Sequence, residues 1–148
     1  MRAAWQTIRQ GATQKHDAAA FAGVTVQPMI RDKGIELILG MTHDAQFGPV
    51  LLFGAGGTLV EVLRDRALAL PPLNEALARR WMRRTKIFRV LQGIRGAPAV
   101  DFVALEQALV NFARLATGDP RLMEIDINPL LATPTGVLAL DARVRLLA

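Results

Sequence analysis

Apolar and polar residues alternate along the last part of the chain, from residue 122 to residue 146. A period of two places successive side chains on opposite faces of a strand. Two such strands are predicted here, joined by the turn residues Thr133-Pro134-Thr135-Gly136. One face of the resulting hairpin is apolar, and the polar face carries Glu124, Asp126, Asn128, Asp141, Arg143 and Arg145.

The polar face of this hairpin brings an amide and a carboxylate together. If Ala132 and Val137 close the turn, Asn128 lies opposite Asp141. Directly opposite side chains have Cβ atoms about 4.5–5.5 Å apart. Two oxygen donors at that separation can share a hard cation such as Mg²⁺, which usually takes one or two protein ligands and completes its shell with phosphates.

A solvated sheet face is the alternative interpretation, and the pattern alone favours it. The same register pairs Asp126 with Arg143 and Glu124 with Arg145, so the charges would form two exposed cross-strand ion pairs. Pro129 adds a second uncertainty to the metal interpretation, because a bulge there would shift the register.

Hydrophobic periodicity divides the rest of the chain into helices and short strands. Helical spacing predicts helices over residues 1–14, 74–86 and 100–116. Apolar runs and alternation predict strands over residues 24–29, 35–41, 50–53 and 60–63. Consecutive strands on short turns, with the helices grouped, predict an α+β fold with a mostly antiparallel sheet and helices packed on one face.

The two later helices carry recognisable boundary signals. Asn74 and Asp101 are predicted N-caps, and Gly118 is a predicted helix end. In the first of these helices Leu77 and Trp81 are expected to face the core, with the arginines outward.

Composition narrows the class of protein. The chain has 148 residues, a net charge of +5 and no cysteine, which excludes disulfides and thiolate zinc. Its apolar runs are too short to span a bilayer, and its start lacks the apolar region of a signal peptide, so we expect a cytoplasmic protein. The chain has a basic cluster within residues 79–86 but no aromatic stacking platform, since Tyr is absent and Phe and Trp are few, which favours a solvated helix face over a nucleic-acid site.

Two further features are candidates for chemistry. The glycine-rich segment Gly54-Ala55-Gly56-Gly57 follows a buried strand, and such a loop can bring backbone N–H groups close to phosphate. It fits neither a P-loop nor GxGxxG, and a tight turn explains it equally well. Glu36 is the one charge in an apolar run, where a glutamate at the rim of an open sheet face is the simpler interpretation.

Six ordered motifs give the chain a family resemblance. They are GVTVQPM, GIELILGM, DAQFGPVLLFGAGGTLVEVLRD, LQGIRGAP, EIDINPLL and ALDARVRL. Together they resemble the second half of the ATP-grasp domain of NDP-forming acyl-CoA synthetases, a group that includes ADP-forming acetyl-CoA synthetase. The module also occurs in Pat-type protein acetyltransferases, and the β subunit of succinyl-CoA synthetase is a more distant relative.

The resemblance implies Mg²⁺ and ATP/ADP as cofactors, with phosphate moving between a phosphohistidine and the nucleotide. It assigns the Mg²⁺ ligands to Asn128 and Asp141, and catalytic roles near the phosphoryl group to Asp126 and Arg95. It assigns nucleotide contacts to Gln27, Pro28, Met29, Glu36, Gly56, Gly57 and Glu61. For Gln27, Pro28 and Met29 the implied contact is through the backbone of a hinge strand.

The resemblance also predicts that parts of the enzyme lie outside this chain. Residues 1–23 correspond to the tail of a first ATP-grasp subdomain, and residues 24–148 to the second subdomain. A helix that begins at the first residue without a cap agrees with a truncated chain. The expected partners are therefore the N-terminal ATP-grasp subdomain and the CoA-binding and ligase domains, and the isolated chain is expected to bind ATP weakly or not at all.

Two other functions remain open from the sequence. A Pat-type acetyltransferase would use the module for regulation. A non-catalytic interaction domain would expose apolar surface and form a homodimer.

Overall fold

The computed structural model describes residues 2–16, 19, 21–57 and 65–147. The chain forms two compact units, Met1–Arg31 and Asp32–Ala148. In the described residues no helix is both long enough and apolar enough to cross a membrane.

In the first unit the described residues include the α-helix α1 (Arg2–Lys15), which confirms the predicted N-terminal helix. Trp5 of this helix packs edge-on against Phe21, with ring centroids 5.9 Å apart. The strand predicted over residues 24–29 is wrong, because residues 21–34 form no regular secondary structure. A strand is held by hydrogen bonds to a neighbour, and this apolar run has none in the described part of the chain.

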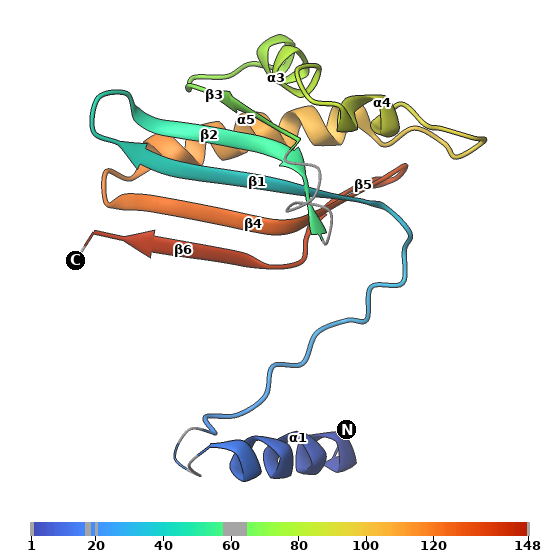
Figure 1. Cartoon of the computed structure of the whole chain (residues 1–148), viewed down its shortest axis with the longest axis vertical. Helices are drawn as coiled ribbons and strands as arrows, with labels where there is room; N and C mark the ends of the chain where they lie inside the picture. Colours follow the sequence, from blue (N-terminus) through green and yellow to red (C-terminus); the bar gives the residue numbers. More distant parts are fainter. Residues whose placement is uncertain (1, 17–18, 20, 58–64, 148) are drawn as a thin grey trace. The chain divides into compact units, whose positions relative to one another are not determined.

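The second unit is built on a six-stranded antiparallel sheet (Figure 1). Its strands are β1 (Ile35–Asp44), β2 (Gly48–Ala55), β3 (Arg66–Ala69), β4 (Leu122–Thr133), β5 (Gly136–Ala139) and β6 (Ala142–Leu146). Their order is β3-β2-β1-β4-β5. Strand β6 also pairs with β4, along the stretch of β4 that β5 does not cover. Central β1 is therefore flanked by β2 and β4, which places the glycine-rich segment and the C-terminal hairpin on either side of it.

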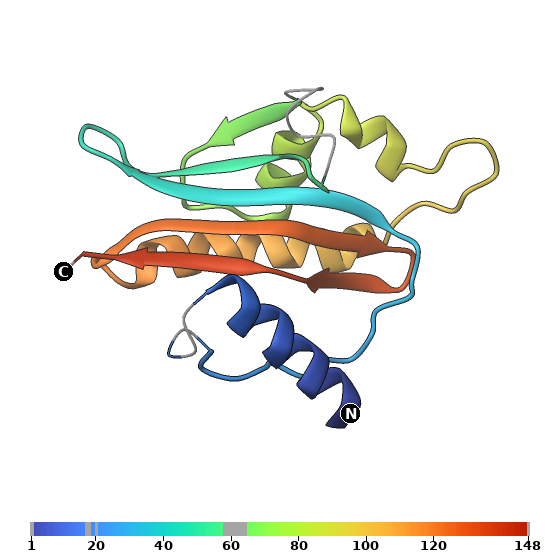
Figure 2. The ribbon, with the colours of Figure 1, turned by 60° about the horizontal axis from the view of Figure 1, so that its bottom comes forward.

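The helices of the second unit pack on one face of this sheet (Figure 2). The long helix α5 (Phe102–Gly118) lies along the sheet, and α3 (Glu75–Met82) and α4 (Ile87–Leu91) complete the layer. The apolar core lies between the two layers, and it includes Leu37, Leu39, Phe53, Trp81, Leu105 and Leu109. The predicted α+β fold is confirmed.

Helix boundaries confirm the predicted caps. The Asn74 side chain accepts a hydrogen bond from the Leu77 N–H at 2.9 Å, and the Asp101 side chain accepts one from the Ala104 N–H at 3.0 Å. Helix α5 ends at Gly118, as expected. Leu77, predicted to face the core, is 43% exposed, so that prediction is wrong.

The helix predicted over residues 74–86 ends early, because α3 stops at Met82, and a second short helix, α4, which was not predicted, begins at Ile87. Asp65, far away in sequence, accepts hydrogen bonds from the backbone N–H groups of Lys86 and Ile87 at 2.8 and 2.6 Å. These bonds favour the start of a new helix at α4, because the first backbone N–H groups of a helix have no partner within it and an acidic side chain can accept from them. Strand β3 was not predicted, whereas the strand predicted over residues 60–63 lies outside the described residues.

Candidate functional site

The polar side of the C-terminal hairpin has the register that the sequence predicts. Asp126 is opposite Arg143 and Glu124 is opposite Arg145 between β4 and β6. Nearer the turn, β4 pairs with β5 in the same register, with Ala132 opposite Val137. Residues 128 and 129 lie between these two paired stretches.

Because the register is the same in both paired stretches, Asn128 lies across from Asp141. Between the paired stretches the Leu140 N–H donates to the Pro129 carbonyl oxygen at 3.0 Å, so the two chains stay in step where β5 ends and β6 begins. The predicted juxtaposition of an amide and a carboxylate therefore agrees with the backbone register.

The bulge considered at Pro129 occurs on the other side of β4. Against β1 the pairing shifts by one residue: Leu37 is opposite Leu130, but Leu39 is opposite Ile127. The extra residue lies in β4, next to Asn128. A bulge bends its strand and re-aims the adjacent side chain. The pairing with β5 and β6 is kept, so the shift does not separate Asn128 from Asp141.

The expected cross-strand ion pairs are only partly formed. Glu124 and Arg145 are joined at 3.1 Å, but both side chains are exposed, and such pairs contribute little stability. Arg143 is 3.9 Å from Asp141 rather than paired with Asp126. The half-buried Asp126 carboxylate has no ion pair or side-chain hydrogen bond within the described residues, which leaves it available to a ligand.

Two backbone N–H groups of the glycine-rich segment donate hydrogen bonds, one to β1 and the other to the C-terminal hairpin. The Gly56 N–H donates to the Glu36 carbonyl oxygen at 2.9 Å, and the Gly57 N–H donates to Asn128 Oδ1 at 3.1 Å. The N–H groups of Gly56 and Gly57 are thus already used within the protein rather than left open for phosphate. The segment instead brings Glu36, Gly57 and Asn128 together at one end of the sheet.

A hollow of about 380 Å³ lies on the sheet face away from the helices. Apolar side chains of β1, β2 and β3 line it, including Ile38 and Leu52, and Asp44, Glu124 and Asp126 add acidic groups. The backbone N–H groups of Gln46 and then Phe47 lower the pKa of Asp44, so this carboxylate is ionised at neutral pH. The hollow therefore combines an apolar floor with negative charge.

Other predicted site residues are not gathered at this point. Arg95 is exposed in the loop between α4 and α5, with a left-handed φ of 49°, and its side chain makes no hydrogen bond or ion pair to a described residue. Glu61 lies outside the described residues. Gln27, Pro28 and Met29 belong to the first unit, and all three are exposed.

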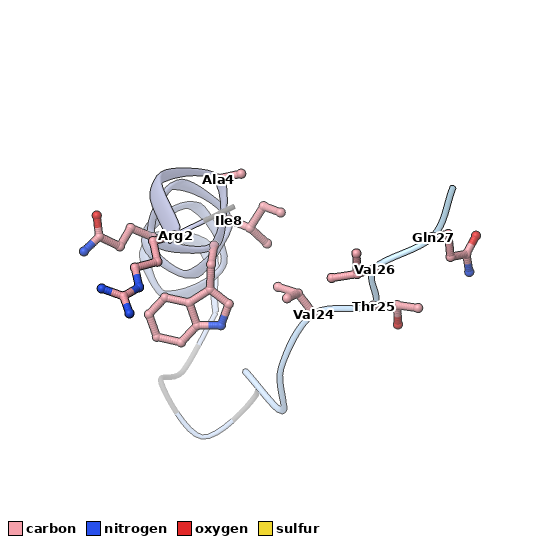
Figure 3. A pocket seen from close by; sticks show the side chains of 9 residues that line it. Arg2, Ala4, Ile8, Val24, Thr25, Val26 and Gln27 are labelled. Carbon is pink, nitrogen blue, oxygen red and sulfur yellow. The ribbon is translucent and has the colours of Figure 1, made fainter. Parts of the chain in front are cut away.

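The first unit has a hollow of its own, of about 650 Å³, between α1 and residues 24–27 (Figure 3). It is mainly apolar, with Trp5, Ile8, Val24 and Val26 in its lining. Gln27 is also a lining residue, and Figure 3 shows it at the end of the segment.

The donor set at the hairpin fits Mg²⁺ better than a transition metal. No three His, Cys, Asp or Glu side chains are grouped for metal binding in the part of the chain that the structure describes. Asn128 and Asp141 offer one amide oxygen and one carboxylate, and both are hard ligands. The Asn128 oxygen has a second lone pair beside the one used by Gly57. Two protein oxygens leave the other positions to phosphate and water.

The fold is an α+β sheet with amide, carboxylate and glycine groups at one end, and comparison with known proteins identifies the family. The chain matches the model of the ATP-grasp domain over residues 1–146. It therefore belongs to the ATP-grasp family. The family resemblance deduced from the six motifs is thereby confirmed.

The chain is similar to ADP-forming acetate–CoA ligases. It is 38% identical over 143 residues to subunit beta of acetate–CoA ligase I of Pyrococcus furiosus, covering 97% of this chain and 61% of that protein. It is also 38% identical over 126 residues to acetate–CoA ligase I of Archaeoglobus fulgidus, covering 85% of this chain and 18% of that one. The chain thus spans about a fifth to three fifths of these relatives.

Solved structures of one archaeal enzyme have the same fold. Acetyl-coenzyme A synthetase 1 of Ca. Korarchaeum cryptofilum, with a phosphorylated phosphohistidine segment, matches with a TM-score of 0.89 and 35% identity, covering 98% of this chain and 64% of that chain. The same protein in complex with coenzyme A and Mg-AMPPCP matches with a TM-score of 0.74 and 38% identity, covering 78% of this chain and 54% of that chain.

Proposed function

We propose that this chain is part of an ADP-forming acyl-CoA synthetase and supplies one wall of its Mg·nucleotide site. One observation carries the proposal: Asn128 lies across from Asp141 and at the same time holds Gly57 beside Glu36. This contact supports a site in which the proposed metal ligands and the proposed nucleotide loop act together. The similarity to ADP-forming ligases supports the same assignment.

In the proposed site Asn128 and Asp141 hold Mg²⁺. When bound, the ion offsets the negative charge of the phosphate oxygens, which is the main requirement of phosphoryl transfer. Glu36 contacts the nucleotide from β1. Asp126, whose carboxylate is free of partners in the described residues, accepts an N–H from the phosphorylated histidine of another domain and so orients it.

The proposed overall reaction converts acyl-CoA, ADP and phosphate into a carboxylic acid, CoA and ATP, and it is reversible. The histidine takes a phosphoryl group from the acyl phosphate, and ADP then takes it from the histidine. The residues described above serve only this second transfer. The CoA chemistry and the histidine come from partner domains or a partner subunit, in agreement with the greater length of the relatives.

Combining the chain with the rest of such a ligase tests this function. The chain is co-expressed with the N-terminal ATP-grasp subdomain and the CoA-ligase part of a relative, and acyl-CoA-dependent ATP formation is measured. We expect Asp141→Ala to reduce the rate at least about 100-fold, because a metal ligand is lost. Asp119→Ala is the matched control, since Asp119 is a partly exposed carboxylate paired with Arg121. Equal rates for Asp141→Ala and the unmodified chain would exclude the metal assignment.

A further inference from the structure

Three residues from separate parts of the sheet meet at the glycine-rich segment. Glu36 lies in β1, Gly57 follows the end of β2, and Asn128 lies beside the bulge of β4. Because β2 and β4 flank β1 on opposite sides, Glu36 is between the other two in the sheet. Their contacts show what each residue does for its neighbours.

The Glu36 side chain occupies the space that a side chain at residue 57 would need. A Cβ atom built on Gly57 would overlap Glu36 Oε2 far inside van der Waals contact, and it would also lie 3.3 Å from the Glu36 Cβ atom. Any residue other than glycine would therefore displace this carboxylate. Gly57 also has a φ of +63°, which L-residues with a side chain rarely adopt.

The backbone beside that carboxylate is held from two directions. On one side the Gly56 N–H donates to the Glu36 main chain, and a Cβ atom at Gly56 would overlap the backbone of Leu37. On the other side Asn128 Oδ1 accepts the Gly57 N–H. The position of Gly57, and with it the space open to Glu36, thus depends on an amide side chain from β4.

We propose that Gly57 and Asn128 are positioning residues for the Glu36 carboxylate. Gly57 leaves the space in which the carboxylate lies, and Asn128 fixes the backbone that borders this space. The inference rests on the proposed function only in taking Glu36 as a nucleotide contact. Asn128 then serves the site twice, as a metal ligand and as the residue that orders the glycine segment.

A double-mutant cycle in the 148-residue chain tests the arrangement without any ligand. Thermal unfolding is measured for Gly57→Ala, for Glu36→Ala and for the double variant. Gly48→Ala is the matched control, since Gly48 has a φ of +70° and nothing within 4 Å of its Cβ position. Both glycine variants carry the conformational strain, but only Gly57→Ala also displaces Glu36. Because the exposed end of the Glu36 side chain can move aside at little cost, we expect a small additional fall of about 1–2 °C in the unfolding midpoint, which disappears in the Glu36→Ala background.

An NMR measurement reports the carboxylate's position directly. The nuclear Overhauser contact between the Glu36 side-chain protons and the Gly57 Hα protons is expected in the unmodified chain. It should weaken in Asn128→Ala and persist in Asn128→Asp, which keeps an acceptor oxygen. Equal midpoints for the Gly57→Ala and Gly48→Ala variants, or a contact unchanged in Asn128→Ala, would overturn the proposal.

The functional consequence is measured in the assembled ligase with Mg·ADP. Gly57→Ala is expected to raise KM for ADP about as much as Glu36→Ala does, roughly 5–10-fold, the two effects being non-additive. Gly48→Ala should change neither KM nor kcat. If Glu36→Ala leaves KM unchanged while the unfolding cycle shows coupling, the nucleotide role of Glu36 fails and the positioning of its carboxylate stands. If the cycle shows no coupling, the positioning role fails whatever the kinetics are.

Discussion

Asn128 Oδ1 accepts a hydrogen bond from the backbone N–H of Gly57 at 3.1 Å, although 71 residues separate the two in sequence. This bond links the C-terminal hairpin to the segment that follows β2, across the central strand of the sheet. The proposed metal ligand and the proposed nucleotide loop are therefore in direct contact, and a substitution at either one is expected to shift the position of the other.

Replacing Asn128 tests this coupling. Asn128→Ala removes the acceptor of the Gly57 N–H, and we expect a loss of about 1 kcal/mol in the free energy of unfolding. Hydrogen exchange of the Gly57 amide should become about 5-fold faster by NMR, corresponding to that loss. Asn128→Asp retains an acceptor oxygen, so its exchange rate should stay close to the original. An unprotected Gly57 amide in the unmodified chain would contradict the bond itself.

The features that were predictable from sequence depend on local patterns. Alternation from residue 122 onward fixed which face of the hairpin is polar, and turn residues fixed the register that sets Asp126 against Arg143. The caps at Asn74 and Asp101 were recognised because each acts on a donor three residues away.

The features that were missed depend on tertiary contacts. The break between α3 and α4 is made by Asp65, more than 20 residues from the N–H groups it binds. Strand β3 has only four residues, and the indole N–H of Trp81 donates to its Ala67 carbonyl oxygen at 3.0 Å. The apolar run near Val24 resembles a strand, but strand formation needs a partner that no local pattern supplies. The use of the Gly57 N–H by Asn128 likewise has no signal in either segment alone.

The ion pair between Arg79 of α3 and Glu106 of α5 predicts an asymmetric pair of variants. Glu106 is 7% exposed, whereas the Arg79 side chain is 47% exposed. Arg79→Ala leaves a buried carboxylate without its partner and should destabilise the fold by about 2 kcal/mol. Glu106→Gln leaves an arginine that water can solvate, so it should cost about 1 kcal/mol or less.

Chemical denaturation of both variants measures this difference. Arg80→Ala is the control, because Arg80 is the exposed neighbour of Arg79 on the same helix and should change stability by less than about 0.5 kcal/mol. A larger loss for Glu106→Gln than for Arg79→Ala would show that the ion pair itself, rather than the burial of Glu106, governs the effect.

Asp119 predicts a specific pH dependence of stability. The side-chain hydrogen bonds from Arg121, helped by the Arg121 backbone N–H, lower the pKa of Asp119 from 3.8 to about 2. A carboxyl whose pKa is lower in the folded chain stabilises the fold above its unfolded pKa, and this contribution is lost as pH falls through the folded value. The contribution should therefore be complete above about pH 4 and should decline toward pH 2.

Unfolding midpoints of the unmodified chain and Asp119→Asn, followed from pH 6 to pH 2, measure this contribution. The two curves should be separated by a constant amount above about pH 4 and should converge below it. Asp32→Asn serves as the control for removing an exposed carboxylate. A separation that stays constant down to pH 2 would mean that Asp119 titrates alike in the folded and unfolded chains.

The isolated chain should bind ADP only weakly and only with Mg²⁺. Glu36 and Asn128 lie beside Gly57, and the register places Asp141 opposite Asn128, so the proposed site presents negative charge to an anionic polyphosphate. Asn128 and Asp141 would hold Mg²⁺ at this point, and its positive charge would offset the repulsion between the carboxylates and the polyphosphate. NMR titration of the 148-residue chain with Mg·ADP is expected to give a dissociation constant of about 1 mM or weaker, and no shifts with ADP in EDTA. Asp141→Ala should remove the Mg²⁺-dependent shifts, whereas Asp119→Ala should keep them. Micromolar binding that persists in EDTA would show that this wall of the site recognises the nucleotide without metal, contrary to the role proposed for Asn128 and Asp141.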